Sequence, residues 1–222
     1  TAHNDVAEGF LASALYAAGR LDESETHAER ARTLNPRNAN ALIALAGIRE
    51  SQGQLAEAAA FLRSALALRP DQPDVQCQLG LLQLRLGRTD EARRALIPAL
   101  RASPARRART LEIGRATAQG GDPRAALFLF QLVLEVAPDD PAALAEAADF
   151  HARQRDFTEA ARLYRRVIEL APHDARARVG LGSVLQLAGD SAAGLAAWRR
   201  ALELDPNYPG LRERLMKASQ SP

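Results

Sequence analysis

Apolar residues recur at steps of three and four along the whole chain, in runs that glycines and prolines separate. Residues 39–72 show the pattern clearly, because one run ends at Gly53 and a second begins directly after it. In the first run Leu42, Leu45 and Ala46 share a helical face, and in the second Leu55, Ala58, Leu62, Ala65 and Leu66 share another. This spacing predicts two amphipathic helices in the segment and an all-helical chain.

The pattern returns with a fixed period of 34 residues. Prolines mark this period at Pro36, Pro70, Pro104, Pro138, Pro172 and Pro206, and they define repeats at 5–38, 39–72, 73–106, 107–140, 141–174 and 175–208. The break between the two helices falls on Gly19, Gly53, Gly87, Gly121 and Gly189, where the chain can adopt the left-handed conformation that ends a helix. Arg155 takes this place in the fifth repeat, where the same geometry should cost about 1 kcal/mol.

Each repeat carries one small residue at position 8, in its first helix, and another at position 20, in its second. From the second repeat on, position 24 holds larger side chains, namely Leu62, Leu96, Phe130, Tyr164 and Trp198. We expect the two helices to approach closely at the small residues, with the larger side chains filling the space around them. Alanine or leucine at Gly80 or Gly182 should therefore overpack the contact, at a cost of about 1–3 kcal/mol.

These positions, together with the usual glycine at position 15 and the proline at position 32, resemble the tetratricopeptide repeat. The tryptophan that the family usually has at position 4 is absent. The resemblance implies an all-α fold, a right-handed superhelical α-solenoid of antiparallel helix pairs. It also implies a single domain over residues 1–222, closed by a capping helix at about 209–218 in which Leu211, Leu215 and Met216 cover the last repeat.

By the same resemblance, the first helix of each pair lines a concave groove that binds a peptide or helix of a partner protein. The groove positions carry Phe10, Tyr16, Ile43, Glu50, Cys77, Leu81, Arg85, Glu112, Arg115, Glu146, Asp149 and Arg153. The first half of this set is the more apolar and the second half the more charged, which would suit an amphipathic helix or an extended peptide. The alternative to partner binding, which we consider equally, is that Phe10 and Tyr16 only cover the core of the first repeat. The lysines and asparagines with which related chaperone binders hold a C-terminal carboxylate are missing, which argues against that activity.

The composition of the chain excludes several classes of function and adds no candidate site. Of the 222 residues, 47% are hydrophobic and 25% are charged, the net charge is +2, and no apolar run is long enough for a membrane span. Cys77 is the only cysteine, and the four histidines are scattered over different repeats. No phosphate-binding loop, nucleophile motif or metal-ligand spacing is present. We therefore expect no catalytic residue, no metal and no cofactor.

The stretch "RASPARRART" concentrates positive charge at Arg101, Arg106, Arg107 and Arg109. The repeat register places it in a turn between the third and fourth repeats, where arginines at a helix N-terminus and Pro98 just before should make this junction the least regular. No aromatic residues are interleaved for base stacking, which argues against nucleic acid. The functional interpretation is a basic edge patch for an acidic protein partner, and the structural interpretation is a solvated turn.

Two classes of function remain open. One is a non-catalytic scaffold or adaptor, of bacterial type, in assembly, secretion or envelope biogenesis. The other is the recognition part of a larger enzyme, such as a glycosyltransferase or a sulfotransferase. Self-association through the first repeat is a third alternative. The cytoplasm and the periplasm are both open, because a signal that precedes Thr1 would be missing from this sequence.

Overall fold

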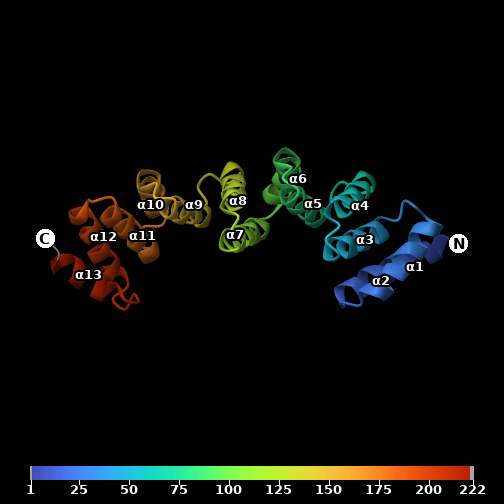
Figure 1. Cartoon of the computed structure of the whole chain (residues 1–222), viewed down its shortest axis with the longest axis horizontal. Coiled ribbons are helices and arrows are strands. Elements are labelled where there is room, and N and C mark those ends of the chain that lie inside the picture. The colour runs from blue at the N-terminus through green and yellow to red at the C-terminus, as the bar shows by residue number, and fades with distance from the viewer. Residues whose placement is uncertain (1, 221–222) are drawn as a thin grey trace. The chain divides into compact units, whose positions relative to one another are not determined.

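The computed structural model describes residues 2–220, and Figure 1 shows them as helices joined by short loops. Within this range there are thirteen helices and no strand. Their bounds are α1 (Ala2–Ala17), α2 (Leu21–Leu34), α3 (Ala39–Ser51), α4 (Leu55–Leu68), α5 (Pro73–Arg85), α6 (Thr89–Ala102), α7 (Pro104–Gln119), α8 (Pro123–Val136), α9 (Pro141–Arg153), α10 (Phe157–Leu170), α11 (Ala175–Leu187), α12 (Ser191–Leu204) and α13 (Leu211–Gln220). The predicted all-α fold of helix pairs is confirmed.

The helices form two compact units, an N-terminal unit that ends at Pro104 and a C-terminal unit that begins at Ala105. In the N-terminal unit, α1–α2, α3–α4 and α5–α6 are antiparallel pairs, and α3 packs against both helices of the pair before it. In the C-terminal unit, α9–α10 and α11–α12 are pairs, and α13 packs against α12. None of the described helices is long and apolar enough to cross a membrane.

The first helix of each of the six pairs ends in the same turn geometry. The predicted glycines have φ values between 74° and 93°, in the left-handed region. Arg155 keeps the same geometry, with φ 62°. Around it the amide of Arg155 donates to the carbonyl of Ala152 at 3.1 Å, and the amide of Asp156 donates to that of His151 at 2.9 Å. The glycine turns make the same two bonds, which satisfy the last carbonyls of the helix.

The close helix contacts also lie where the sequence places them. Gly80 lies against Leu96, Gly114 against Phe130 and Gly182 against Trp198. A Cβ atom built on Gly182 would come within 2.9 Å of the carbonyl oxygen of Gly194, a backbone atom that cannot turn aside. The large side chain at position 24 thus takes the volume that a side chain at position 8 would need.

The junction between α6 and α7 differs from the prediction, because the expected turn is helical. Helix α6 runs through Pro98 to Ala102, and α7 begins at Pro104, so only Ser103 separates them. At other junctions a side chain at position 34, such as Asn38, Asp140 or Asp174, accepts an amide hydrogen bond and sets the helix start. Arg106 stands there in α7 and has no acceptor atom, so the helix begins at the proline. This junction therefore differs from the other junctions between repeats, where four or more residues separate the helices.

Helix α13 covers the core of the last helix pair, as expected, but with fewer residues than predicted. Leu211 is 1% exposed and packs with Trp198 and Ala201, and Leu215 joins them from one turn later. Met216 is 59% exposed, so its predicted role in the cover is wrong. One residue after Leu215, Met216 is turned about 100° away around the helix.

Arg155 supplies a test of the turn geometry. Arg155→Gly should raise the free energy of unfolding by about 1 kcal/mol, because glycine adopts the left-handed conformation without a Cβ clash. Arg153→Gly is the matched control, since Arg153 is an exposed residue two positions earlier in the right-handed last turn of α9, where glycine should destabilise. Urea unfolding followed by circular dichroism measures both. Equal destabilisation by the two changes would contradict strain at Arg155.

Gly182 supplies a test of the close contact. Gly182→Ala should lower the free energy of unfolding by about 1–3 kcal/mol, because the new methyl group overlaps Trp198 and the Gly194 carbonyl. At an exposed helix position the same change would stabilise by up to about 1 kcal/mol. The sign measured by thermal unfolding therefore distinguishes overpacking from helix propensity, and a gain in stability would refute the contact.

Candidate functional site

The clearest recess among the predicted groove residues lies in the C-terminal unit. It is a cavity of about 330 Å³ to which α7, α9, α10 and α11 contribute. Its apolar wall consists of Pro141, Ala142, Ala145 and Ala177, and its polar groups come from Arg115, Glu146, Asp149, Tyr164, Asp174 and Arg176. Three predicted groove residues, Arg115, Glu146 and Asp149, therefore come together at one cavity.

An ion pair connects α7 with α9 at this cavity. Arg115 donates to the carboxylate of Glu146 at 2.8 Å. The two side chains differ in exposure, since that of Glu146 is 7% exposed and that of Arg115 is 44% exposed. The carboxylate thus lies in the wall, whereas the guanidinium extends from it into solvent. Because a guanidinium has five N–H donors, most of them stay available to a ligand.

A second polar group connects α9 with α10 and α11. Asp149 accepts a hydrogen bond from the hydroxyl of Tyr164 and another from Arg176, the latter at 3.2 Å. Burial and the adjacent Asp149 carboxylate raise the pKa of Tyr164 above its usual value, so the phenol keeps its proton. The side chain of Arg176 is 63% exposed, so it resembles Arg115 in being held at one end and open at the other.

Tyr164 was not among the predicted site residues. The sequence pattern places the Tyr164 ring correctly in the core, where it is 4% exposed, but it says nothing of the hydroxyl, which reaches Asp149. Arg176 stands at position 2 of its repeat, which the family resemblance assigns to the groove, and the structure places it at the cavity with Arg115, Glu146 and Asp149. The predicted residues Glu112 and Arg153 are exposed on α7 and α9 and do not line the cavity.

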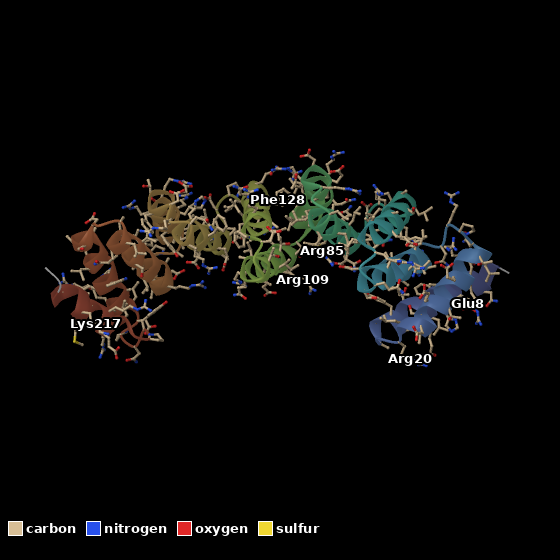
Figure 2. The ribbon with its side chains drawn as sticks, viewed as in Figure 1. Glu8, Arg20, Arg85, Arg109, Phe128 and Lys217 are labelled. Carbon is tan, nitrogen blue, oxygen red and sulfur yellow. The ribbon has the colours of Figure 1, made fainter. Side chains whose placement is uncertain are left out.

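The predicted residues of the N-terminal unit form smaller groups. Glu50 on α3 accepts a hydrogen bond from Arg85 on α5 at 2.6 Å, which connects two first helices (Arg85 is labelled in Figure 2). Tyr16 is half-buried against Gly47, and Ile43 packs beside the core of its pair. Phe10 is 62% exposed, so it does not cover the core of the first repeat, in contrast to the alternative that the sequence left open.

Two other groove predictions and the basic residues have varied surroundings. Cys77 and Leu81 are half-buried on α5. Arg101 is exposed at the end of α6, and Arg109 is exposed on α7 (labelled in Figure 2). The other two arginines, Arg106 and Arg107, are half-buried in the first turns of α7, and Arg107 lies 3.9 Å from the carboxylate of Asp140. The structural interpretation of this stretch, a solvated turn, is therefore wrong for Arg106 and Arg107. The functional interpretation, a basic edge patch, stays a prediction.

No metal-ligand geometry accompanies these residues. Within the described part of the chain, no three side chains among histidine, cysteine, aspartate and glutamate are placed to hold a metal ion. His151 lies 3.0 Å from Asp156, and His27 lies 2.5 Å from Glu8, each as an isolated pair. At the cavity, the polar groups are joined by hydrogen bonds and ion pairs.

The helices form successive antiparallel pairs, and a left-handed residue follows the first helix of each pair. Together with the polar residues on the first helices, this arrangement defines a helix-pair repeat protein. A tetratricopeptide repeat family model matches residues 11–73, 111–174 and 146–209, and a second tetratricopeptide repeat model matches residues 49–112. The chain belongs to the tetratricopeptide repeat family. None of the curated proteins matches it significantly in sequence.

Solved structures share the fold at low identity. The Pseudomonas aeruginosa protein pilF is 20% identical, with a TM-score of 0.50, and the match covers 97% of this chain and 98% of that one. The first repeat domain of Spaghetti (RPAP3), bound to an HSP90 peptide, is 19% identical with a TM-score of 0.50, over 53% of this chain and 94% of that one. A Thermobaculum terrenum O-GlcNAc transferase is 31% identical with a TM-score of 0.47, over 51% of this chain. The match spans only 22% of that transferase.

Tyr164 gives the cavity a measurable pH dependence. Because its pKa is raised in the folded state, its contribution to stability is complete below the ordinary tyrosine pKa of about 10 and is lost as pH rises beyond it. The free energy of unfolding should therefore fall above about pH 10. Tyr164→Phe should flatten this fall, whereas Tyr208→Phe, the control, should keep it. Urea unfolding over a pH series measures the slope, and identical slopes for the two variants would contradict the assignment.

Proposed function

We propose that this protein is a non-catalytic scaffold that binds a peptide or helix of a partner protein along the exposed sides of its first helices. The observation that carries the proposal is the cavity in the C-terminal unit, where Arg115 and Arg176 are each held by a carboxylate and have side chains that are 44% and 63% exposed. Two oriented guanidinium groups beside an apolar wall form a receptor for a polar chain with small side chains.

The chemistry of the cavity specifies the ligand further. Its apolar wall is built of alanines and a proline, so it offers room for a small aliphatic side chain. Arg115 and Arg176 can then donate to the backbone carbonyls or to an acidic side chain of the same peptide. Glu146 and Asp149 are already occupied by these arginines and hold them in place, which lowers the entropy lost on binding.

The N-terminal unit offers a second, more apolar segment of the same kind of surface. Leu81 is half-buried and Phe10 is exposed on its first helices, and the Glu50–Arg85 pair supplies one polar contact. This character supports the expected binding of an amphipathic partner segment. The role we propose is that of an adaptor in assembly or secretion, and a recognition part of a larger enzyme would use the same surfaces.

Peptide selection tests the proposal. Peptides selected by phage display against the purified protein should lose at least tenfold in affinity when Arg115→Gln and Arg176→Gln are combined, as measured by isothermal titration calorimetry. Glutamine keeps a donor for each carboxylate, so the fold should survive the changes. Arg162→Gln is the matched control, because Arg162 is also an exposed arginine that is paired with a carboxylate, that of Glu159, but lies on a second helix.

The outcomes separate clearly. Loss in the double variant with unchanged affinity in the Arg162 variant supports binding at the cavity. Equal affinity in all three proteins would place the peptides elsewhere and refute the proposed site.

A further inference from the structure

A second cavity lies in the N-terminal unit, where α4, α5 and α6 meet (Figure 1). Its volume is about 300 Å³, and its apolar lining consists of Leu66 of α4, Leu79 of α5, and Ala95 and Pro98 of α6. Leu79 is turned about 160° around α5 from the predicted groove residue Leu81. The cavity is therefore separate from the binding surface that we propose on the first helices.

Two glutamines line this cavity at positions where other repeats have buried leucines. Gln76 and Gln83 stand at positions 4 and 11 of the third repeat. The amide of Gln76 donates to the carbonyl of Pro70 at 2.9 Å, in the loop before α5. In four other repeats one of these two positions holds a leucine that is between 5% and 8% exposed, namely Leu15, Leu42, Leu144 and Leu185. The third repeat therefore has amide groups beside a cavity where apolar side chains pack elsewhere.

Gln83 is a buried polar residue without a partner for its side-chain oxygen. It is 1% exposed, and within residues 2–220 this oxygen accepts no hydrogen bond. Other polar residues at position 11 are paired, since Arg49 donates to Glu25 at 2.5 Å and the hydroxyl of Thr117 donates to the carbonyl of Ile113 at 2.7 Å. An unpaired buried amide is costly. Rotation about the last side-chain bond can turn the oxygen of Gln83 towards the cavity, so a donor that enters the cavity would satisfy it.

Two arginines stand at the rim of the cavity, on the helices at either side of α5. Arg63 of α4 and Arg94 of α6 are exposed lining residues. In the described part of the chain, neither of them belongs to an ion pair. Among the lining residues Glu91 adds one carboxylate, so two positive charges face one negative charge. Such guanidinium groups can lie over an aromatic ring and can pair with carboxylates of a ligand.

From these observations we infer that this cavity binds a tryptophan side chain from an acidic segment of a partner protein. The indole ring packs against Leu66 and Leu79, and its N–H group donates to the oxygen of Gln83. Acidic residues beside the tryptophan pair with the two arginines at the rim. The cavity lies at the lower end of the range of about 300–1,000 Å³ for ligand pockets, which suits one side chain of this size.

Other side chains match the cavity less completely. An aliphatic side chain would cover the apolar lining and leave the oxygen of Gln83 unpaired. A carboxylate would pair with Arg63 and Arg94 but has no proton to donate to that oxygen. The protein already contains an indole in such surroundings, because Trp198 packs in a core cluster and its N–H group donates to the carbonyl of Val179 at 3.1 Å.

NMR titration tests the inference, with the methyl signals of Leu79 as the probe in protein that contains isotope-labelled leucine. A blocked tripeptide with tryptophan between two glutamates should shift these signals until saturation. A tripeptide with leucine between two glutamates lacks the donor, so its affinity should be about tenfold lower. A tripeptide with tryptophan between two lysines meets the arginines with like charge, and its affinity should also fall about tenfold.

Two variants test the site itself. Gln83→Leu should lower the affinity for the tryptophan peptide about tenfold and should raise the melting temperature, because the unpaired amide is removed. Leucine occupies this position in the first and sixth repeats, so the fold should accept it. Gln76→Trp should abolish the saturable shift, because the new indole fills the cavity from within. The family usually has tryptophan at this position, which favours folding of this variant too.

Thr117→Leu is the matched control, because Thr117 stands at position 11 of the fourth repeat, and this variant should bind like the native chain. The variant with Arg115→Gln and Arg176→Gln should also bind like the native chain, so failure of the proposed function leaves this measurement unaffected. A native chain whose Leu79 signals show no saturable shift overturns the inference. Equal affinity of the Gln83→Leu variant and the native chain, or equal affinity of the tryptophan and leucine peptides, overturns the pairing of indole with Gln83.

Discussion

The close approach of two backbones within each helix pair is the contact on which the rest of the structure depends. At Gly182 there is room for hydrogen alone, because a Cβ atom would come within 2.9 Å of the Gly194 carbonyl and would overlap Trp198. Once the large side chain at position 24 is held there, it offers a fixed surface to the next element, as Trp198 does to Leu211. The contact inside a pair therefore determines what the next helix can bury, and it leaves the remaining sides of the first helices for polar residues.

Those polar residues have two roles at once. Arg115 and Glu146 connect α7 with α9, while Asp149 and Arg176 connect α9 with α11. A buried carboxylate without a partner would be costly, so Glu146, whose side chain is 7% exposed, needs its arginine. An arginine can satisfy that need with one or two N–H groups and present the others to a ligand, which the point charge of a lysine does less well. This explains how the same pairs can support the stacking of helices and still form a receptor surface.

The sequence predicted what depends on neighbouring residues. The five glycine turns follow from the chemistry of a few adjacent positions and are confirmed, and Arg155 adopts the same left-handed geometry in the sixth turn. The start of α7 was predicted less well. Pro104 can begin a helix and stands three residues before the position at which the repeat register would start it, and Arg106 offers no capping side chain that would favour the later start. At the candidate site, the pattern assigned Arg115, Glu146 and Asp149 to one side of the helices, but their pairing depends on side-chain conformations. The hydroxyl of Tyr164 was missed for the same reason.

The contact between successive pairs uses the same repeat positions each time that it is formed in the N-terminal unit. In α3 and α5 the residues at positions 3, 7 and 10 are buried, and those at positions 3 and 7 pack on the second helix of the preceding pair. Helix α13 makes a contact of the same kind, since Leu211 and Leu215 pack on Trp198 and Ala201 of α12 while the charged residues of α13 are exposed. The spacing of apolar residues at the start of a helix therefore serves both to join one pair to the next and to cover the last pair of the C-terminal unit.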